Sequence, residues 1–506
     1  MRVMRVLFYI CFFFVFIDLS YATKIRIEGR QMFVNDNLFT IKGVCYSGVP
    51  VGYNYTYAWE GDSQSYNMDF PLIKAMGANC IRTYHDLLYP YPMDAAYKHG
   101  IYVIMEMGIT WNTDYTNQRT RTNVINSARR MVDKWKDHPA LLMWMLGHEN
   151  NVNSHLTNGS LKLDGTATNR LKQFYPLVNE VAGLIHEWEK PNWHPVTYGD
   201  AVADSTNFGI YKYPGVGIAG ATTVGSPIFF SDDSHMNNLD VWGIQVYNGA
   251  GFDPNLFSTY KNLSSKPLWI AETGCDAFNM VTHQEDQDSQ VVYVTRQWDG
   301  IKNNLSSLDK DDVIAGVTFF NWDDGWWKYS SGGMYTHDTN GTWPNSSYSY
   351  DYVPGCNNMN EEWWGFVSIF PGTYQRGIRK IYYEMQKLWT TGNEGKELNN
   401  FLFRKNTVNV PNPFSLSAGV STDIWVYLNY SSVVKALIYD YSGKFIRELN
   451  SPAEYAGYLY DLKWDGKDQH GNKVRTGLYL CKVKARYRVQ DSSQQETQII
   501  KIAVVK

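Results

Sequence analysis

The sequence predicts an α/β fold, a (β/α)8 TIM barrel, followed by a small all-β immunoglobulin-like sandwich. Short apolar runs alternate with longer helical or polar stretches, which is typical of parallel strands joined by helices. Eight such runs lie between Ile41 and Asn321, and that length fits a closed eight-stranded barrel. From Pro411 onward, short strand patterns separated by glycines are typical of a β-sandwich. We therefore expect two domains in the 506 residues.

Each expected barrel strand is a short apolar run rich in β-branched or aromatic residues. In chain order the runs are Ile41–Tyr46, Asn79–Tyr84, Ile101–Met107, Leu141–Leu146, Pro195–Tyr198, Val241–Tyr247, Leu268–Ala271 and Ala315–Asn321. Apolar residues between them recur at helical spacing, as from Leu177 to Trp188. The stretch from Glu361 to Trp389 is expected to form the last helical layer.

The expected domain limits follow changes in composition. Residues 23–390 should form the barrel domain, residues 391–408 a polar linker, and residues 409–506 the sandwich. The expected strands of the sandwich are Thr422–Leu428, Val434–Tyr439, Tyr458–Trp464, Gly477–Val483 and Gln498–Val505.

Residues 1–22 have the pattern of a secretory signal peptide. Arg2 and Arg5 precede an apolar run from Val6 to Ile17, and small residues near Ala22 suit a signal peptidase. We therefore expect a protein that is secreted or held in the cell envelope. That run is too short to cross a bilayer as a helix, and no other segment is long and apolar enough, so no membrane span is expected.

The charge, the aromatic content and the cysteine spacing of the chain limit the partners and cofactors that we expect. The formal net charge of −4 argues against nucleic acid, which requires a basic surface. Aromatic residues make up 15% of the chain, which suits stacking on sugar rings and equally an aromatic-rich core. The cysteines lack the paired spacing of a zinc site, and nothing else in the sequence suggests a metal or an organic cofactor, so neither is expected.

Two carboxylates follow apolar strands at the barrel end where active sites form. Glu149 comes after the fourth run and Glu272 after the seventh. Two carboxylates facing each other across a barrel mouth can cleave a glycosidic bond with retention of configuration. The alternative is that each glutamate pairs with a basic residue and ties strands together. A complete count of eight strands, with the glutamates on the fourth and seventh, favours catalysis.

The region from Lys42 to Trp327 resembles the catalytic barrel of glycoside hydrolase family 2. That family belongs to a clan of retaining glycosidases with the acid/base on strand four and the nucleophile on strand seven. The segments that carry the resemblance are Ile81–His85, Gly100–Glu106, His138–Glu149 and Pro267–Gly274. Ile41–Val44 and Gly77–Arg82 are also similar to fungal β-1,3-glucanosyltransferases, which share the barrel.

The resemblance implies a role for each of five residues. Glu149 would be the acid/base and Glu272 the nucleophile. Tyr247 would donate a hydrogen bond to the nucleophile, and Arg82 would lower its pKa. Trp322 would form the floor of the −1 sugar site. Tyr247 and Trp322 could instead be core aromatics, and Arg82 a structural ion-pair partner.

Other polar residues at the strand ends are candidates for substrate contact. They are His85, His148 and Asn150, while Glu106 is at least as well suited to a supporting role. Family 2 has an asparagine immediately before the acid/base, where this chain has His148. An imidazole can still donate a hydrogen bond, but the identity of the −1 sugar is open. Only residues 23–40 precede the first expected strand, where family members usually carry β-sandwiches, so a shortened member or a sister group is expected.

The C-terminal region resembles the immunoglobulin-like domain of flagellar hook-capping proteins. The matching segments are Pro411–Phe414, Ile438–Gly443, Trp464–Gly466 and Gly477–Tyr479. This resemblance implies a bacterial source and a spacer or sorting role, with contact to the envelope or secretion machinery as one form of it.

Three functions fit the sequence. The first is hydrolysis of a β-linked oligo- or polysaccharide by double displacement at the two glutamates. The second is transglycosylation on the same carboxylates, as in a β-glucanosyltransferase. The third is glycan binding without catalysis, which is suggested by His148 in the place of the asparagine that precedes the acid/base in family 2.

Overall fold

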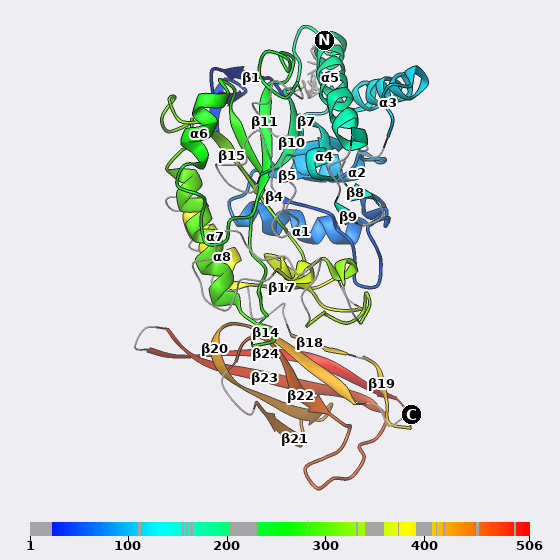
Figure 1. Cartoon of the computed structure of the whole chain (residues 1–506). Coiled ribbons are helices and arrows are strands. Elements are labelled where there is room, and N and C mark those ends of the chain that lie inside the picture. The colour runs from blue at the N-terminus through cyan, green and yellow to red at the C-terminus, as the bar shows by residue number, and fades with distance from the viewer. Residues whose placement is uncertain are drawn as a thin grey trace, which may run out of the picture.

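The computed structural model contains a closed barrel and a separate C-terminal β domain (Figure 1). It describes residues 23–505 except 110–112, 154–155, 158–159, 162–164, 203–229, 281, 330–331, 340–358, 373, 391–406, 411, 418–420, 452–454 and 490–491. The expected signal peptide and nearly all of the expected linker lie outside the described residues. No helix among the described residues is long and apolar enough to cross a membrane.

Eight parallel strands close the barrel and confirm the predicted fold class. Their order is β4 (Ile41–Cys45), β5 (Cys80–Arg82), β6 (Tyr102–Met107), β7 (Leu141–His148), β10 (Val196–Val202), β11 (Val241–Val246), β12 (Leu268–Glu272) and β15 (Ile314–Phe319), which pairs back to β4. Each expected run overlaps one of these strands. The runs read as continuously apolar because parallel barrel strands are buried on both faces.

Helices surround the barrel in Figure 1 and bury their apolar faces against it. They are α1 (Ser63–Ala75), α2 (Tyr91–Lys98), α3 (Gln118–Trp135), α5 (Gly165–Trp188), α6 (Leu256–Leu263), α7 (Gln287–Lys302) and α8 (Lys380–Trp389), with the short α4 (Asn150–Asn153) directly after the fourth barrel strand. The apolar face expected from Leu177 to Trp188 is the second half of α5.

The stretch from Glu361 to Trp389 is not one helical layer. A 3-10 turn, Glu361–Trp363, leads into a hairpin of β16 (Val367–Ile369) and β17 (Arg376–Ile378), and only α8 is helical. Both strands contain β-branched residues, and Asp323 extends the pairing to β16 through a bridge to Val367. Tertiary pairing therefore overrides the helical pattern in the first half of the segment.

A short sheet precedes the barrel. It consists of β1 (Ile25–Glu28), β2 (Gln31–Val34) and β3 (Asn37–Phe39), paired antiparallel. Ile25, Met32 and Val34 of this sheet share a buried cluster with barrel residues such as Trp269.

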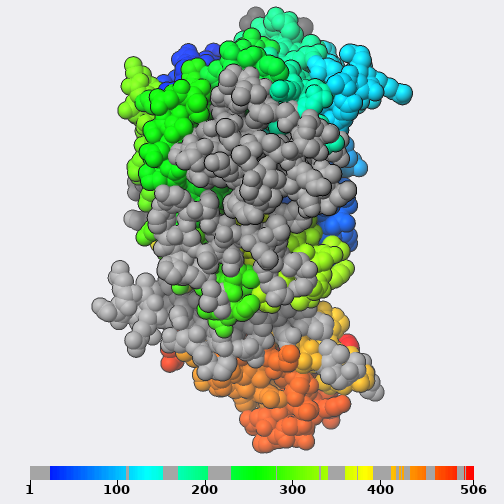
Figure 2. All heavy atoms as spheres, viewed as in Figure 1, coloured from blue at the N-terminus to red at the C-terminus, as the bar shows by residue number. Residues whose placement is uncertain are grey.

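The C-terminal domain is built on one long strand. β20 (Thr422–Asp440) covers two of the expected strands: its first part pairs with β22 (Tyr455–Trp464), and its second part pairs with β23 (Gly477–Val489) and β21 (Phe445–Asn450). The other strands are β18 (Thr407–Val410), β19 (Phe414–Ser415) and β24 (Ser492–Val505). They enclose a core of their own around Trp464. In Figure 2 these orange to red residues gather at one end of the molecule.

Candidate active site

Glu149 and Glu272 lie together at the C-terminal end of the barrel. Glu272 is the last residue of β12, and Glu149 follows β7 directly. One carboxylate oxygen of each, with a ring nitrogen of His148, lies within 4.8 Å of the others. Oxygens within this limit fit the separation of roughly 5–5.5 Å between the carboxyl groups of retaining glycosidases better than the roughly 6.5–9.5 Å of inverting ones.

Glu272 is buried and accepts hydrogen bonds from three side chains. Arg82 of β5 bonds Oε1 through Nη1, and Tyr84 donates to the same oxygen over 2.8 Å. Tyr247, directly after β11, donates to Oε2 over 2.7 Å. Burial alone would raise the pKa of Glu272, but the positive charge of Arg82 and the hydrogen bonds from the two phenols outweigh it and lower that pKa. Glu272 is therefore ionised at neutral pH.

His148 contributes a neutral ring with a defined tautomer. Burial, the largest influence, lowers the pKa of His148 to about 4, so its ring is uncharged near pH 7. Arg82 and the Gln245 amide nitrogen both face Nδ1, at 3.1 and 3.2 Å. Both are donors, so Nδ1 accepts and the proton lies on Nε2. We therefore assign the ionised state of Glu272 to Arg82 and the phenols, and His148 offers an N–H donor beside Glu149.

Glu149 has the opposite electrostatic surroundings. Burial and then the charge of Glu272 raise its pKa, although Arg82 opposes the shift. A carboxylic acid in this position keeps its proton at neutral pH. The His148 Nε2 atom lies 3.7 Å from its Oε2. The two glutamates thus have pKa values displaced in opposite directions, as an acid and a nucleophile require.

The backbone at Glu149 is held in an uncommon conformation. Its φ of 49° lies in the left-handed region, which costs free energy for a residue with a side chain. Neighbouring β10 compensates: the Glu149 N–H donates to the Gly199 carbonyl, and the Asn150 N–H donates to the Tyr198 hydroxyl, both over 2.9 Å. These bonds fix the direction in which the Glu149 side chain leaves the strand.

Arg82 also connects the nucleophile to a second buried carboxylate. Its Nη2 donates to Glu106 over 2.7 Å. Burial raises the pKa of Glu106 to about 7 despite the guanidinium. A guanidinium that already binds Glu272 disfavours a divalent cation at the cluster formed by His148 and the two glutamates, because the positive charges would repel each other.

Of the other residues predicted from sequence, Arg82, His148 and Tyr247 contact the carboxylate pair, whereas the side-chain hydrogen bonds found for His85 and Asn150 go elsewhere. His85 accepts a hydrogen bond from the Trp59 indole over 3.2 Å. The Asn150 amide donates to the carbonyl of Ile109 over 3.0 Å, so it braces the chain.

The structure does not support the sugar-floor role predicted for Trp322. Trp322 is fully buried and packs edge-on against Tyr382 of α8, with 6.3 Å between the ring centroids. Phe320 lies nearer the carboxylate pair, since its ring is 6.4 Å from those of Tyr84 and Tyr247, which both donate to Glu272. The physical reason is that β15 ends at Phe319, two residues earlier than predicted, so Phe320 is the first residue beyond the strand.

Sequence reasoning also missed Tyr84 and Gln245. Tyr84 lies two residues after Arg82, and alternate residues of a strand share a face, so this spacing could have indicated it. Gln245 has the same relation to Tyr247.

A group of aromatic and charged residues, including Lys328 and Glu361, acts on the pair from nearby. The Lys328 ammonium forms an ion pair with Glu361 and lies 4.5 Å from the Phe320 ring centroid. Trp327 contacts Tyr55, with 5.7 Å between ring centroids. Lys328 and Glu361 both act electrostatically on Glu149, in opposite directions.

Two family matches cover parts of the chain. Residues 25–163 match the family described as glycosyl hydrolases family 2, TIM barrel domain, and residues 416–488 match the FlgD Ig-like domain. The first match includes Glu149 and ends before Glu272. These findings confirm the predicted resemblance of the barrel to family 2 and of the C-terminal domain to hook-capping proteins.

Curated relatives include glycoside hydrolases. A β-galactosidase of Psychromonas ingrahamii is 23% identical over 140 residues, or 26% of this chain and 13% of the relative. A β-glucuronidase of Paenibacillus borealis is 28% identical over 140 residues, or 25% and 22%. The chain thus spans less than a quarter of these relatives. A solved β-glucuronidase of Bacteroides uniformis aligns with a TM-score of 0.46 at 16% identity, covering 96% of this chain and 48% of that one.

Proposed function

We propose that this chain, with a barrel like that of glycoside hydrolase family 2, hydrolyses β-linked oligo- or polysaccharides with retention of configuration. Glu272 is the nucleophile and Glu149 the acid/base. The observation that carries the proposal is the pair itself: two carboxylates with oxygens within 4.8 Å and pKa values displaced in opposite directions.

In the first step Glu272 attacks the anomeric carbon. An ester bond forms between its oxygen and that carbon, the glycosidic bond breaks, and Glu149 gives its proton to the leaving oxygen. Arg82, Tyr84 and Tyr247 keep the nucleophile ionised before attack.

In the second step water replaces the leaving group. Esterification removes the negative charge of Glu272, which is one of the causes that raise the pKa of Glu149. The pKa of Glu149 therefore falls in the intermediate, and its carboxylate takes a proton from water. The resulting hydroxide attacks the anomeric carbon, the ester breaks, and Glu149 is again protonated.

His148 supports a polar contact to the sugar. Its Nε2–H faces the space beside Glu149, where family 2 has an asparagine amide. The imidazole N–H of His148 thus replaces the amide N–H as hydrogen-bond donor, on a side chain of different shape. Transglycosylation would use the same carboxylates with a sugar in place of water, and long products at high substrate concentration would indicate it.

The proposed cellular location rests on the sequence pattern of the N-terminus. We propose that residues 1–22 direct the protein out of the cytoplasm of a bacterium, to the envelope or the medium. The match of residues 416–488 to the FlgD Ig-like domain is compatible with a spacer or sorting role for the C-terminal domain, in contact with envelope or secretion components.

The test compares variants of the two glutamates on aryl β-glycosides. We expect Glu272→Gln to abolish turnover. Glu149→Ala should retain slow activity on substrates with a good leaving group, and azide should restore its turnover by attacking the glycosyl-enzyme in place of water. Glu180→Gln, on the exposed side of α5, is the control and should behave as wild type. Azide rescue of Glu272→Ala alone would reverse the assigned roles, and full activity of Glu272→Gln would exclude the mechanism.

A further inference from the structure

A hollow on the barrel is lined by residues other than the two glutamates. Eight residues line it: Tyr53, Asn54, Thr56, Tyr57, Ala58, Gly61, Asp62 and Tyr374. Its volume is about 590 Å³, within the roughly 300–1,000 Å³ of small-ligand sites. All but one of these residues come from the loop between β4 and α1, and the other follows β16.

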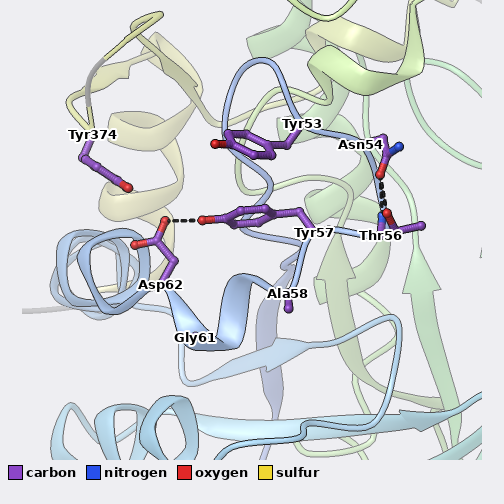
Figure 3. Close-up of a pocket in the computed structure, with 8 residues that line it drawn as sticks. All are labelled: Tyr53, Asn54, Thr56, Tyr57, Ala58, Gly61, Asp62 and Tyr374. Atoms are coloured by element: carbon purple, nitrogen blue, oxygen red, sulfur yellow. Dashed lines mark hydrogen bonds between the residues drawn. The ribbon is translucent and has the colours of Figure 1, made fainter.

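The hollow combines an aromatic wall with polar groups. The rings of Tyr53 and Tyr57 lie 4.6 Å apart at 48° to each other. The hydroxyl groups of Tyr53, Tyr57 and Tyr374 point into the same space, toward the Asp62 carboxylate (Figure 3). Tyr57 donates to Asp62 over 3.0 Å. Aromatic faces beside hydroxyl and carboxylate groups suit a sugar ring, which has apolar C–H faces and a polar rim.

Among the residues of the hollow, Tyr53 offers a ring face and a hydroxyl that a ligand could contact. Its side chain is 52% exposed, and no hydrogen bond of its hydroxyl is found among the described residues. Tyr57, by contrast, is already held by Asp62, which also accepts the Gln64 N–H at the start of α1. The wall is therefore fixed on one side and open to a ligand on the other.

A path of aromatic contacts connects this loop to the catalytic pair. Tyr55, between two lining residues, contacts Trp327, and Lys328 lies over both Trp327 and Phe320. Trp59 of the same loop donates to His85, next to Tyr84, which bonds Glu272. The loop leaves β4 at the C-terminal end of the barrel, the end that holds both glutamates.

We propose that this hollow is a remote subsite that binds one sugar unit of a β-linked glycan while another of its bonds lies at Glu149 and Glu272. This inference rests on the proposed function and narrows it: the substrate is a chain of several sugars, and the protein distinguishes it from a simple glycoside by stacking on Tyr53 and Tyr57.

The test measures kcat/KM of Tyr53→Ala on two substrates. Each substrate is the one that wild type cleaves fastest in its panel. The first panel consists of 4-nitrophenyl β-monosaccharides, and the second of β-linked hexasaccharides. We expect about a tenfold loss on the hexasaccharide, since one stacking contact and its buried area are lost. The value on the aryl monosaccharide should stay within about twofold, because that substrate cannot reach the hollow.

Tyr97→Ala is the matched control. Tyr97 lies on α2 outside the hollow and is 54% exposed, close to the value for Tyr53. It should leave both substrates unchanged. Tyr53→Phe, which keeps the ring, should retain most of the hexasaccharide activity. Equal losses of Tyr53→Ala on both substrates, or no loss on either, would overturn the inference.

The two proposals can fail separately. If wild type cleaves aryl glycosides and Glu272→Gln does not, the catalytic proposal stands whatever the Tyr53 variant does. If wild type cleaves none of them, calorimetric titration with the hexasaccharides still examines the hollow. Weaker binding by Tyr53→Ala than by Tyr97→Ala would then support a sugar site there, and equal binding would reject it.

Discussion

Three donors converge on the Glu272 carboxylate, while the buried Glu149 carboxyl faces the negative charge of that carboxylate. Arg82 supplies a full positive charge, and Tyr84 and Tyr247 supply phenol hydrogens. Hydrogen bonds to the charged form favour ionisation, whereas burial beside a like charge favours the proton. A single pair of identical side chains thus acquires two chemical roles from its neighbours.

Removing one of these donors should move the acid side of the pH profile. In Tyr247→Phe the ionised Glu272 loses a 2.7 Å hydrogen bond, so its lowered pKa rises toward the ordinary value. Because catalysis needs the ionised form, the acid limb of kcat/KM should move to higher pH by about one unit or more, since a bond to a charged group is worth about 1.5–3 kcal/mol. At neutral pH Glu272 stays ionised in both proteins, so kcat/KM should change less there than on the acid limb.

The control for this profile is Tyr260→Phe. Tyr260 is buried, and its hydroxyl donates to the carbonyl of Lys266, away from Glu272. It should leave the acid limb in place. An unmoved limb in Tyr247→Phe would mean that the acid limb does not report Glu272.

At the scale of elements, β10 supports the segment that carries the acid/base. Asp200 of β10 is fully buried and accepts the Tyr175 hydroxyl of α5 through both oxygens, at 2.9 and 3.2 Å. Tyr198 bonds Asp200 and accepts the Asn150 N–H. A helix, a strand and the residue after Glu149 are therefore joined through one carboxyl group.

Asp200 should make folding stability depend on pH. Burial raises its pKa to about 8, although the two phenols oppose the shift. Between about pH 4 and 8 the unfolded chain releases this proton while the folded chain keeps it, so the free energy of unfolding falls as pH rises through this window. Above pH 8 the loss is complete and constant.

Asp200→Asn tests this by chemical denaturation at several pH values. Because asparagine carries no proton to release, the stability of the variant should fall less between pH 4 and 8 than that of wild type. Other buried carboxyl groups contribute equally to both proteins and cancel in the difference. Parallel stability curves for the two proteins would contradict the raised pKa of Asp200.

The elements also show what the sequence can and cannot predict. Buried parallel strands have continuous apolar runs, so all eight were predictable, and so was the proximity of the two glutamates at the ends of two of them. The ends of strands were harder to predict: β15 ends two residues before the predicted end, so Phe320, and not Trp322, is the first residue beyond the strand. Contacts such as Tyr84 to Glu272 join residues 188 apart in the chain, and no local pattern encodes them.

At the scale of the whole molecule, the described residues form distinct cores in the barrel and in the C-terminal domain. Trp242 belongs to the main barrel core and Trp464 to the core of the C-terminal domain, where it packs against Phe414 and Tyr479 with ring centroids 5.5 and 5.2 Å away. Damage to one core should therefore leave the other folded, provided that each domain holds itself together.

Trp464→Ala tests this independence in the full chain. Loss of a fully buried tryptophan costs about 3–5 kcal/mol, enough to unfold a marginally stable small domain. We expect one calorimetric transition to move to lower temperature or vanish, while the other transition and kcat/KM on an aryl β-glycoside stay within about twofold of wild type. Trp242→Ala should do the reverse, lowering the barrel transition and removing activity. Loss of activity in Trp464→Ala at a temperature where the barrel transition is unchanged would show instead that the C-terminal domain supports the catalytic site.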